Sequence, residues 1–349
     1  PVGNFHVPHP SHCGPGCFVL RPISWVRALR VGSAILVVAL GSAGCELTEV
    51  TVAEPEGVLV SEAYIRIGEG RDQVTAFLQW TLGTGELDAL KAAEITILPD
   101  GGEAIPLRWT SPRECLQMDA TEEVEGACFV PSDEIEGILE PGTRAEVEIR
   151  LMDGRELKGG TLIPHDIQFI QPQASFICAL PPGQNLDLIW NESPGAWAYS
   201  AEAEIIGLRE ALAPQGIEVE DDSLSLLGLA VSEADTSIVF PREFGIFNRF
   251  ELQQEVAVAL QEGLPEGAQA AVAVAALDRN YVNWVRGGNF NPSGVVRISS
   301  LRGDGIGVLA SAVRRSVVIV GAQGAGVPSC FGSQERGSRG GFGPVPFLP

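Results

Sequence analysis

Short runs in which apolar and polar residues alternate, each ended by a turn signal, fill most of the chain after residue 57. Such an alternation with period 2 directs one set of side chains to a core and the other to solvent, as half-buried antiparallel strands do. Clusters such as Pro99-Asp100-Gly101-Gly102 separate the runs and mark turns. The pattern predicts a mostly β protein. Clear examples are VLVSEAYIRI (58–67), QVTAFLQWTL (73–82) and RAEVEIRLMDG (144–154).

The spacing of these runs predicts two β-sandwich domains. Seven or so short strands within 57–164 are typical of an immunoglobulin-like β-sandwich. The Pro-bounded stretch 164–172 is expected to be a linker, and 173–330 is expected to form a second antiparallel β-sandwich. Within that second block, RNYVNWVRG (279–287) predicts a short helix. The run 249–261 fits neither a helix face nor an alternation throughout, and we predict a strand there.

An export signal precedes these domains. Basic residues begin the segment 27–44, an apolar run occupies 34–40, small residues follow, and Cys45 comes directly after them. This order is that of a bacterial secretory signal, and the cysteine makes it resemble a lipoprotein signal in which Cys45 is acylated. Ser42 stands where an aliphatic residue is usual. A transmembrane helix is the alternative, but the run is shorter than the roughly 20 apolar residues that span a bilayer.

Three further segments are expected to lie outside the folded domains. Residues 1–26 are interpreted as an upstream stretch translated from a mis-called start, which would be discarded with the signal. Their closely spaced histidines and cysteines leave a zinc site as the alternative. The polar stretch 45–56 is expected to be a tether, and the Gly/Pro/Ser-rich tail 331–349 is expected to be disordered.

The charge balance excludes two kinds of partner. The chain has 23 basic and 45 acidic residues, a formal net charge of −22. A surface this acidic repels nucleic-acid phosphates and anionic lipid headgroups. We therefore expect no nucleic-acid partner, and contact with the membrane only through a lipid anchor.

Four cysteines follow Cys45, and an even number in an exported chain indicates disulfide bonds. Cys115 and Cys128 flank a short acidic loop, as the two ends of a hairpin would, and Cys178 and Cys330 could then join the second block to its end. Three connectivities are open to four cysteines, and buried free thiols are the alternative.

No pattern in the sequence predicts a catalytic site. His165 is the one histidine after Cys45, and no nucleophile-elbow or zinc-protease motif occurs. The acidic run at 218–222 could supply paired carboxylates for glycoside hydrolysis, but nothing apolar surrounds it, which favours a solvated charge run. We expect no catalytic residues, no metal ligands and no cofactor.

Aromatic residues are the remaining candidates for binding. Trp80 and Trp190 lie on predicted strands and are assigned to the core. Tyr281 and Trp284 are the candidates for an exposed contact patch, since Tyr and Trp are favoured at binding surfaces.

The segment around 280–320 carries a resemblance to a known family. It runs from D-R-N-Y-V-N-W through Asn291-Pro292 to a strand and then to Gly305-Ile306-Gly307. This order resembles two-domain outer-membrane lipoproteins, a domain-of-unknown-function family associated with TonB-dependent receptors. Leu309 replaces the family's aromatic residue, and Ser299-Ser300-Leu301 replaces its asparagine. Gly303, Gly305 and Gly307 precede no amphipathic helix, so they predict a tight turn or bulge rather than a dinucleotide-binding loop.

The resemblance implies an outer-membrane lipoprotein, facing the periplasm or the cell surface, that accompanies a receptor or another envelope protein. The expected function is therefore non-catalytic binding in the bacterial envelope. A glycan hydrolase with paired carboxylates and a structural cell-surface adhesin are the alternatives.

Overall fold

The residues that the computed structural model describes all belong to the unit Glu56–Pro349. The described residues are 57–68, 72–81, 85–112, 115, 125–173, 176–230, 232–245, 254–287, 298–322 and 326–332. The predicted segments 1–26, 27–44 and 45–56, Cys45 with them, lie outside these ranges, and so does the tail beyond residue 332. No described helix is long and apolar enough to cross a membrane.

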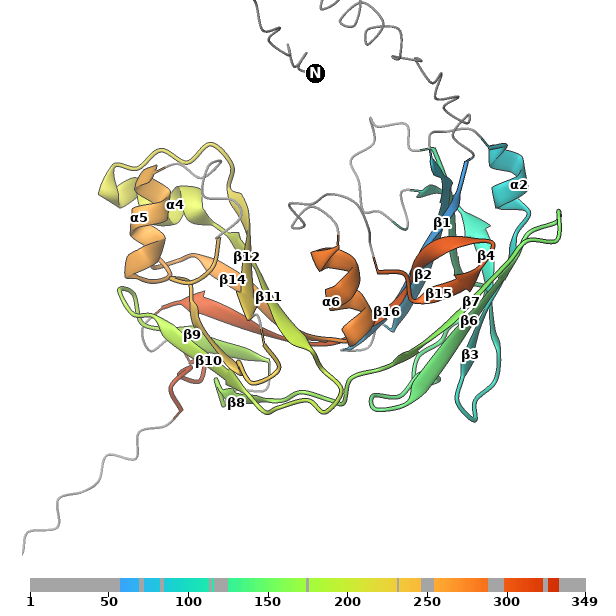
Figure 1. Ribbon diagram of the computed structural model, residues 1–349. Coiled ribbons are helices and arrows are strands. Elements are labelled where there is room, and N and C mark those ends of the chain that lie inside the picture. The colour runs from blue at the N-terminus through green and yellow to red at the C-terminus, as the bar shows by residue number, and fades with distance from the viewer. Residues whose placement is uncertain are drawn as a thin grey trace, which may run out of the picture. The chain divides into compact units, whose positions relative to one another are not determined.

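Strands dominate the described residues, as the alternation predicts (Figure 1). The first group is β1 (Leu59–Ile67), β2 (Gln73–Trp80), β3 (Glu94–Pro99), β4 (Ile105–Thr110), β5 (Ala127–Pro131), β6 (Arg144–Arg150), β7 (Glu156–Leu162) and β8 (Phe169–Gln171). The second group is β9 (Ile177–Leu180), β10 (Leu186–Trp190), β11 (Ala198–Ile206), β12 (Ser223–Ala230), β13 (Ser237–Phe240), β14 (Gln269–Leu277), β15 (Leu301–Gly303) and β16 (Gly305–Gly321). The helices are α2 (Leu87–Lys91), α4 (Leu208–Leu212), the 3₁₀ turn η3 (Ala213–Gln215), α5 (Gln254–Glu262) and α6 (Arg279–Arg286).

One large sheet runs through both predicted domains. Its strand order is β12-β11-β14-β16-β1-β2-β5-β4-β3-β6-β7-β15, with β9 pairing on β16 as well. A second sheet has the order β13-β10-β8. The mostly β prediction, with β-sandwich packing and a short helix, is confirmed.

Two large hydrophobic cores, beside two smaller clusters, lie within the described part of this architecture. The first is enclosed by the large sheet itself, with inward side chains from β1 to β7 meeting those of β15 and the first part of β16. The second lies between the other end of the large sheet and the three-stranded sheet, with α4 and α5 packed against it. Trp190, predicted to be a core residue, is 1% exposed in the second core.

The 17-residue strand β16 belongs to both cores. Leu309 and Val313 pack in the first core, while Val317 and Ile319 pack in the second. The beginning of β16 pairs parallel with β1, and its later part pairs with β14 and β9. The predicted boundary between 57–164 and 173–330 therefore does not separate the two cores, because the end of the chain returns to complete the first one.

The predicted linker 164–172 is wrong in part. Phe169–Gln171 forms β8 and pairs with β10, and Ile167 is buried in the second core. Because its backbone pairs in the second sheet, this segment is part of the folded structure and not a free connection between two domains.

The strand predicted at 249–261 is also wrong over its described part, which is the helix α5. Val256 and Leu260 are four residues apart, share one side of the helix and are buried in the second core, whereas Val258 is exposed. The tertiary contact of that one side decides the helix, since the local pattern alone fits neither period throughout.

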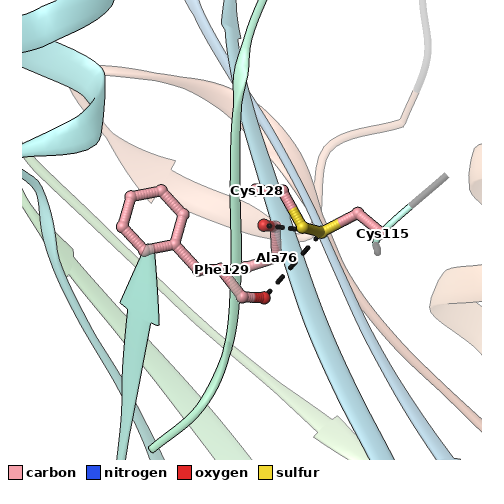
Figure 2. The surroundings of a disulfide bond; sticks show 4 residues. All are labelled: Ala76, Cys115, Cys128 and Phe129. Atoms are coloured by element: carbon pink, nitrogen blue, oxygen red, sulfur yellow. Dashed lines mark hydrogen bonds between the residues drawn. A yellow bond between two sulfur atoms is a disulfide. The ribbon is translucent and has the colours of Figure 1, made fainter. Parts of the chain in front are cut away.

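Both expected disulfides are present. Cys115 is bonded to Cys128, and Cys178 to Cys330. Figure 2 shows the first bond beside β2 and β5, where the Cys115 Sγ atom lies 3.5 Å from the carbonyl oxygen of Ala76. Cys128, Cys178 and Cys330 are fully buried. The predicted pairing is therefore confirmed, and the free-thiol alternative is excluded.

The glycines before and within β16 differ in role from the prediction. Gly303 has a φ of +129°, which agrees with a turn that favours glycine. Gly305 and Gly307 instead lie inside β16, where a Cβ atom on Gly307 would stand 2.0 Å from the Ser61 carbonyl oxygen. Close approach of the β1 backbone, rather than a turn, requires glycine there.

Candidate functional site

A cleft of about 440 Å³ lies on one side of the large sheet. It extends over five strands that are neighbours in the sheet order, from β11 through β14, β16 and β1 to β2, with one residue from α6. Its volume falls in the range of small-molecule sites. The lining residues are Arg66, Ile67, Gly68, Gln73, Ser200, Glu202, Ala273, Ala275, Leu277, Tyr281, Ala312 and Arg314.

The strand register sets the order of the polar groups across the cleft. Arg66 on β1 stands opposite Ala312 on β16, and Arg314 lies two residues further along β16. Arg314 is opposite Ala275, and Ala275 is opposite Ser200 on β11. Two residues beyond Ser200 on the same strand is Glu202. The two arginines thus lie at one side of the cleft and the carboxylate at the other.

Small side chains form the floor between these groups. Ala273, Ala275 and Ala312 occupy alternate positions of β14 and β16 on the cleft side. Their neighbours Val272, Val274 and Val313 point the other way into the cores. Alanine at the cleft-facing positions leaves the volume that larger side chains would fill.

The cleft arginines have no acidic ion-pair partner within the described ranges. Neither Arg66 nor Arg314 forms an ion pair with another described residue, and Glu202 forms none either. The Arg66 guanidinium lies 5.3 Å from the centroid of the Tyr64 ring, a cation–π distance. In contrast, Arg315 next to Arg314 pairs with Asp166 at 2.6 Å. The cleft arginines thus lack a carboxylate partner among the residues that the structure describes, in a chain whose sequence has 45 acidic residues.

Two tyrosines lie beside the arginines. The rings of Tyr64 and Tyr281 are 5.7 Å apart, and the Tyr64 hydroxyl donates a hydrogen bond to Glu62. Burial raises the pKa of both phenols; the charge of Glu202 raises that of Tyr281 further, while Arg66 lowers it. Both phenols are therefore protonated at neutral pH, so that Tyr281 can donate a hydrogen bond to a ligand in the cleft.

A buried carboxylate positions the helix that carries Tyr281. Asp278 is the N-cap of α6 and accepts a hydrogen bond of 2.7 Å from the Tyr281 backbone N–H. It also accepts one from the Thr161 hydroxyl on β7, while its own N–H donates to the Ser311 carbonyl on β16. Asp278 therefore ties α6 to strands of both cores.

Burial raises the pKa of Asp278 above its ordinary value of 3.8, against the opposing effect of its hydrogen bonds. The folded state then holds this proton more tightly than the unfolded state, so ionising Asp278 costs stability as the pH rises through the window above 3.8. We expect Asp278→Asn, which keeps the capping acceptor, to gain stability relative to the natural chain as the pH rises. Urea unfolding of both proteins between about pH 3.5 and about pH 7.5 measures this. A constant difference between the two proteins over that range would contradict it.

The two residues predicted to form an exposed contact patch differ in their position in the structure. Tyr281 does line the cleft, but Trp284 is 3% exposed and the prediction of an exposed patch there is wrong. Trp284 packs against Val60, Val308 and Ala310, because this side of α6 faces the sheet. Trp80, predicted to be core, is partly buried and lies under the Arg155 guanidinium, 4.4 Å from the ring.

The acidic run at 218–222 does not take part in the cleft. Glu218, Glu220, Asp221 and Asp222 are exposed, as the solvated interpretation predicts. Within the described ranges, no group of three or more His, Cys, Asp or Glu side chains is arranged to hold a metal ion.

Sequence reasoning did not find Arg66, Arg314 or Glu202. Each occupies a polar position of an alternating strand, where a charged residue is ordinary. The one local signal is the alternation of alanine with valine on β14, which indicates a strand with small side chains on one side. The pairing of that strand with the arginine-bearing β16 is a property of the fold.

Comparisons with known proteins add little to this description. No family model matches the chain, and no curated protein matches it. Among solved structures, the fibronectin(III)-like modules of CbhA from Clostridium thermocellum align at 11% identity with a TM-score of 0.19, over 75% of this chain and 90% of that one. The IG1+IG2 structure of DIP-gamma aligns at 10% identity with a TM-score of 0.18, over 77% of this chain and 99% of that one.

Proposed function

We propose that this chain is a non-catalytic binding protein of the bacterial envelope, anchored to the outer membrane by lipid on Cys45. The observation that carries the binding role is the cleft, in which charged and aromatic groups surround a floor of small side chains. A concave site with a few convergent polar groups is the usual form of a ligand site. In this proposal the protein holds its ligand beside a TonB-dependent receptor, as its family resemblance implies.

The composition of the cleft supports binding rather than hydrolysis. Glycoside hydrolysis in its usual form needs two carboxyl groups on either side of the bond. Of the described residues that line the cleft, Glu202 alone carries a carboxylate, and Glu202 is exposed. The lining arginines and tyrosine are suited to hold and orient a ligand.

The anchor is tested by lipid labelling. Cells grown with radiolabelled palmitate are expected to label the natural chain and not Cys45→Ser, because the thiol is the acyl acceptor. Lipidation by several acyl chains makes membrane residence stable, so the natural chain is expected in the membrane fraction. Equal labelling of both proteins, or equal fractionation with membranes, would show that Cys45 is not the anchor.

The receptor partnership is tested separately, by purification of the tagged full chain from solubilised outer membranes. We expect an outer-membrane receptor to co-purify in stoichiometric amount with the natural chain and to be lost with Cys45→Ser. If mass spectrometry finds no outer-membrane receptor, the accessory role is wrong, whatever the labelling experiment shows.

A further inference from the structure

The arrangement of charges in the cleft narrows the class of ligand. Arg66 and Arg314 lie on neighbouring strands, one step of two residues apart along β16, so their Cα atoms are about 8 Å from each other. Like charges this close on one side of a sheet disfavour each other when nothing lies between them. Since neither has an ion-pair partner among the described residues, an anionic group on the ligand would satisfy both.

The opposite side of the cleft favours a cation. Glu202 is separated from Arg314 by two strand spacings and one step of two residues, which puts their Cα atoms about 12 Å apart. An anionic ligand that also reached Glu202 would be repelled by this carboxylate. A positive or strongly donating group at that end would be attracted.

The middle of the cleft is lined by apolar side chains. Ala273, Ala275 and Leu277 of β14 lie between the two charged sides. A ligand with small apolar groups between its charges fits this floor, because the alanine side chains leave room and offer no hydrogen-bonding group.

We infer that the cleft binds a short peptide of two or three residues with both ends free. Arg66 and Arg314 hold its terminal carboxylate, and Glu202 holds its terminal ammonium. An extended chain spans at most about 3.3–3.6 Å per residue, so two or three residues place the two charges about 7–10 Å apart. With a hydrogen bond of about 2.8 Å at each end, the head groups that hold the peptide must be about 13–16 Å apart, so the side chains of Arg314 and Glu202 stand upright from the sheet or lean outward to meet them. This inference rests on the proposed binding function and names its ligand.

The test uses trialanine and its two blocked forms. Calorimetric titration of the purified full chain compares trialanine with N-acetyl-trialanine, which lacks the ammonium, and with trialanine amide, which lacks the carboxylate. Each blocked form is expected to bind about tenfold more weakly or worse, since hydrogen bonds to charged groups contribute about 1.5–3 kcal/mol.

Two variants assign each end of the peptide to its side of the cleft. In Arg314→Gln the penalty for the amide form should fall, with the remainder due to Arg66, while the penalty for the acetyl form is unchanged. In Glu202→Gln the penalty for the acetyl form should largely vanish while the penalty for the amide form is unchanged. Both residues are exposed, so the variants are expected to fold, and circular dichroism checks this. Arg108→Gln, which removes an exposed arginine on β4 outside the cleft, should bind all three peptides as the natural chain does.

Several outcomes would overturn the inference. Equal affinity for the free and blocked peptides would remove the role of the two ends. No binding of any of the three peptides would show that the ligand class is wrong. Binding of galacturonate in their place, an anionic sugar without an ammonium group, would show the same. In that case lipid labelling at Cys45 and receptor co-purification still decide the proposed function, so the two failures are distinguishable.

Discussion

Replacing Cys178 and Cys330 together with alanine is expected to lower the free energy of unfolding by about 4–5 kcal/mol. The bond joins residues 152 apart in sequence, so it closes a long loop and removes much conformational freedom from the unfolded chain. Both cysteines are fully buried in or beside the second core, and the bond holds the segment around Cys330 against β9. Urea unfolding of the oxidised proteins measures the loss in the free energy of unfolding. In thermal unfolding, the same loss should lower the melting temperature by about 10 °C or more.

The other disulfide supplies the matched control. Cys115 and Cys128 are 13 residues apart, so removing that bond is expected to cost less, about 3 kcal/mol. If the Cys115→Ala/Cys128→Ala protein proves the less stable of the two variants, loop length does not govern the contribution of these bonds.

A methyl group at Gly307 is expected to destabilise the fold by about 3 kcal/mol. Gly307 on β16 stands opposite Ser61 on β1, and an added Cβ atom would lie 2.0 Å from the Ser61 carbonyl oxygen. Backbone atoms on neighbouring strands cannot move aside as a flexible side chain can, so the pairing of β1 with β16 must open. Since this pairing joins the first core to the strand shared by both, Gly307→Ala should shift the urea midpoint of the whole unit.

Gly160→Ala is the control for that substitution. Gly160 also lies in a strand, β7, but a Cβ atom there would have its nearest neighbour at 3.4 Å, at the limit of ordinary contact. Its stability should remain within about 1 kcal/mol of the natural chain, because fewer unfolded conformations offset the slight crowding. Equal losses for the two variants would mean that strand glycines matter here for a reason other than close backbone approach.

Both predictions concern elements on which the cleft depends. β1 carries Arg66 and β16 carries Arg314, so the distance between the two guanidinium groups is set by the pairing that Gly307 permits. The Cys178–Cys330 bond begins in β9, which pairs with the later part of β16 and so supports the strand beyond Arg314. The site is therefore held by contacts distant from its own lining residues.

Local chemistry explains the parts of the fold that the sequence predicts well. The alternation in β6 and over residues 61–67 of β1 reflects a half-buried strand, and it survives in the structure as alternate buried and less buried side chains. In β2 three successive side chains are buried, so the alternation is lost there. Where the pattern was ambiguous, as at α5, a few contacts of one helix side with the second core decided the outcome. The burial of Trp284 could not be predicted for the same reason. The sequence of a short helix such as α6 does not show which of its sides packs against the sheet.

The sequence by itself determined that this chain is mostly β, that its four cysteines after Cys45 are candidates for disulfide bonds, and that Cys45 is the residue to test as an anchor. These depend on period, composition and spacing, which are local properties. Only the tertiary structure placed Arg66, Arg314 and Glu202 around one cleft and made β16 common to two cores. The physical reason is that strands far apart in sequence become neighbours through pairing, and their register fixes which side chains share a surface.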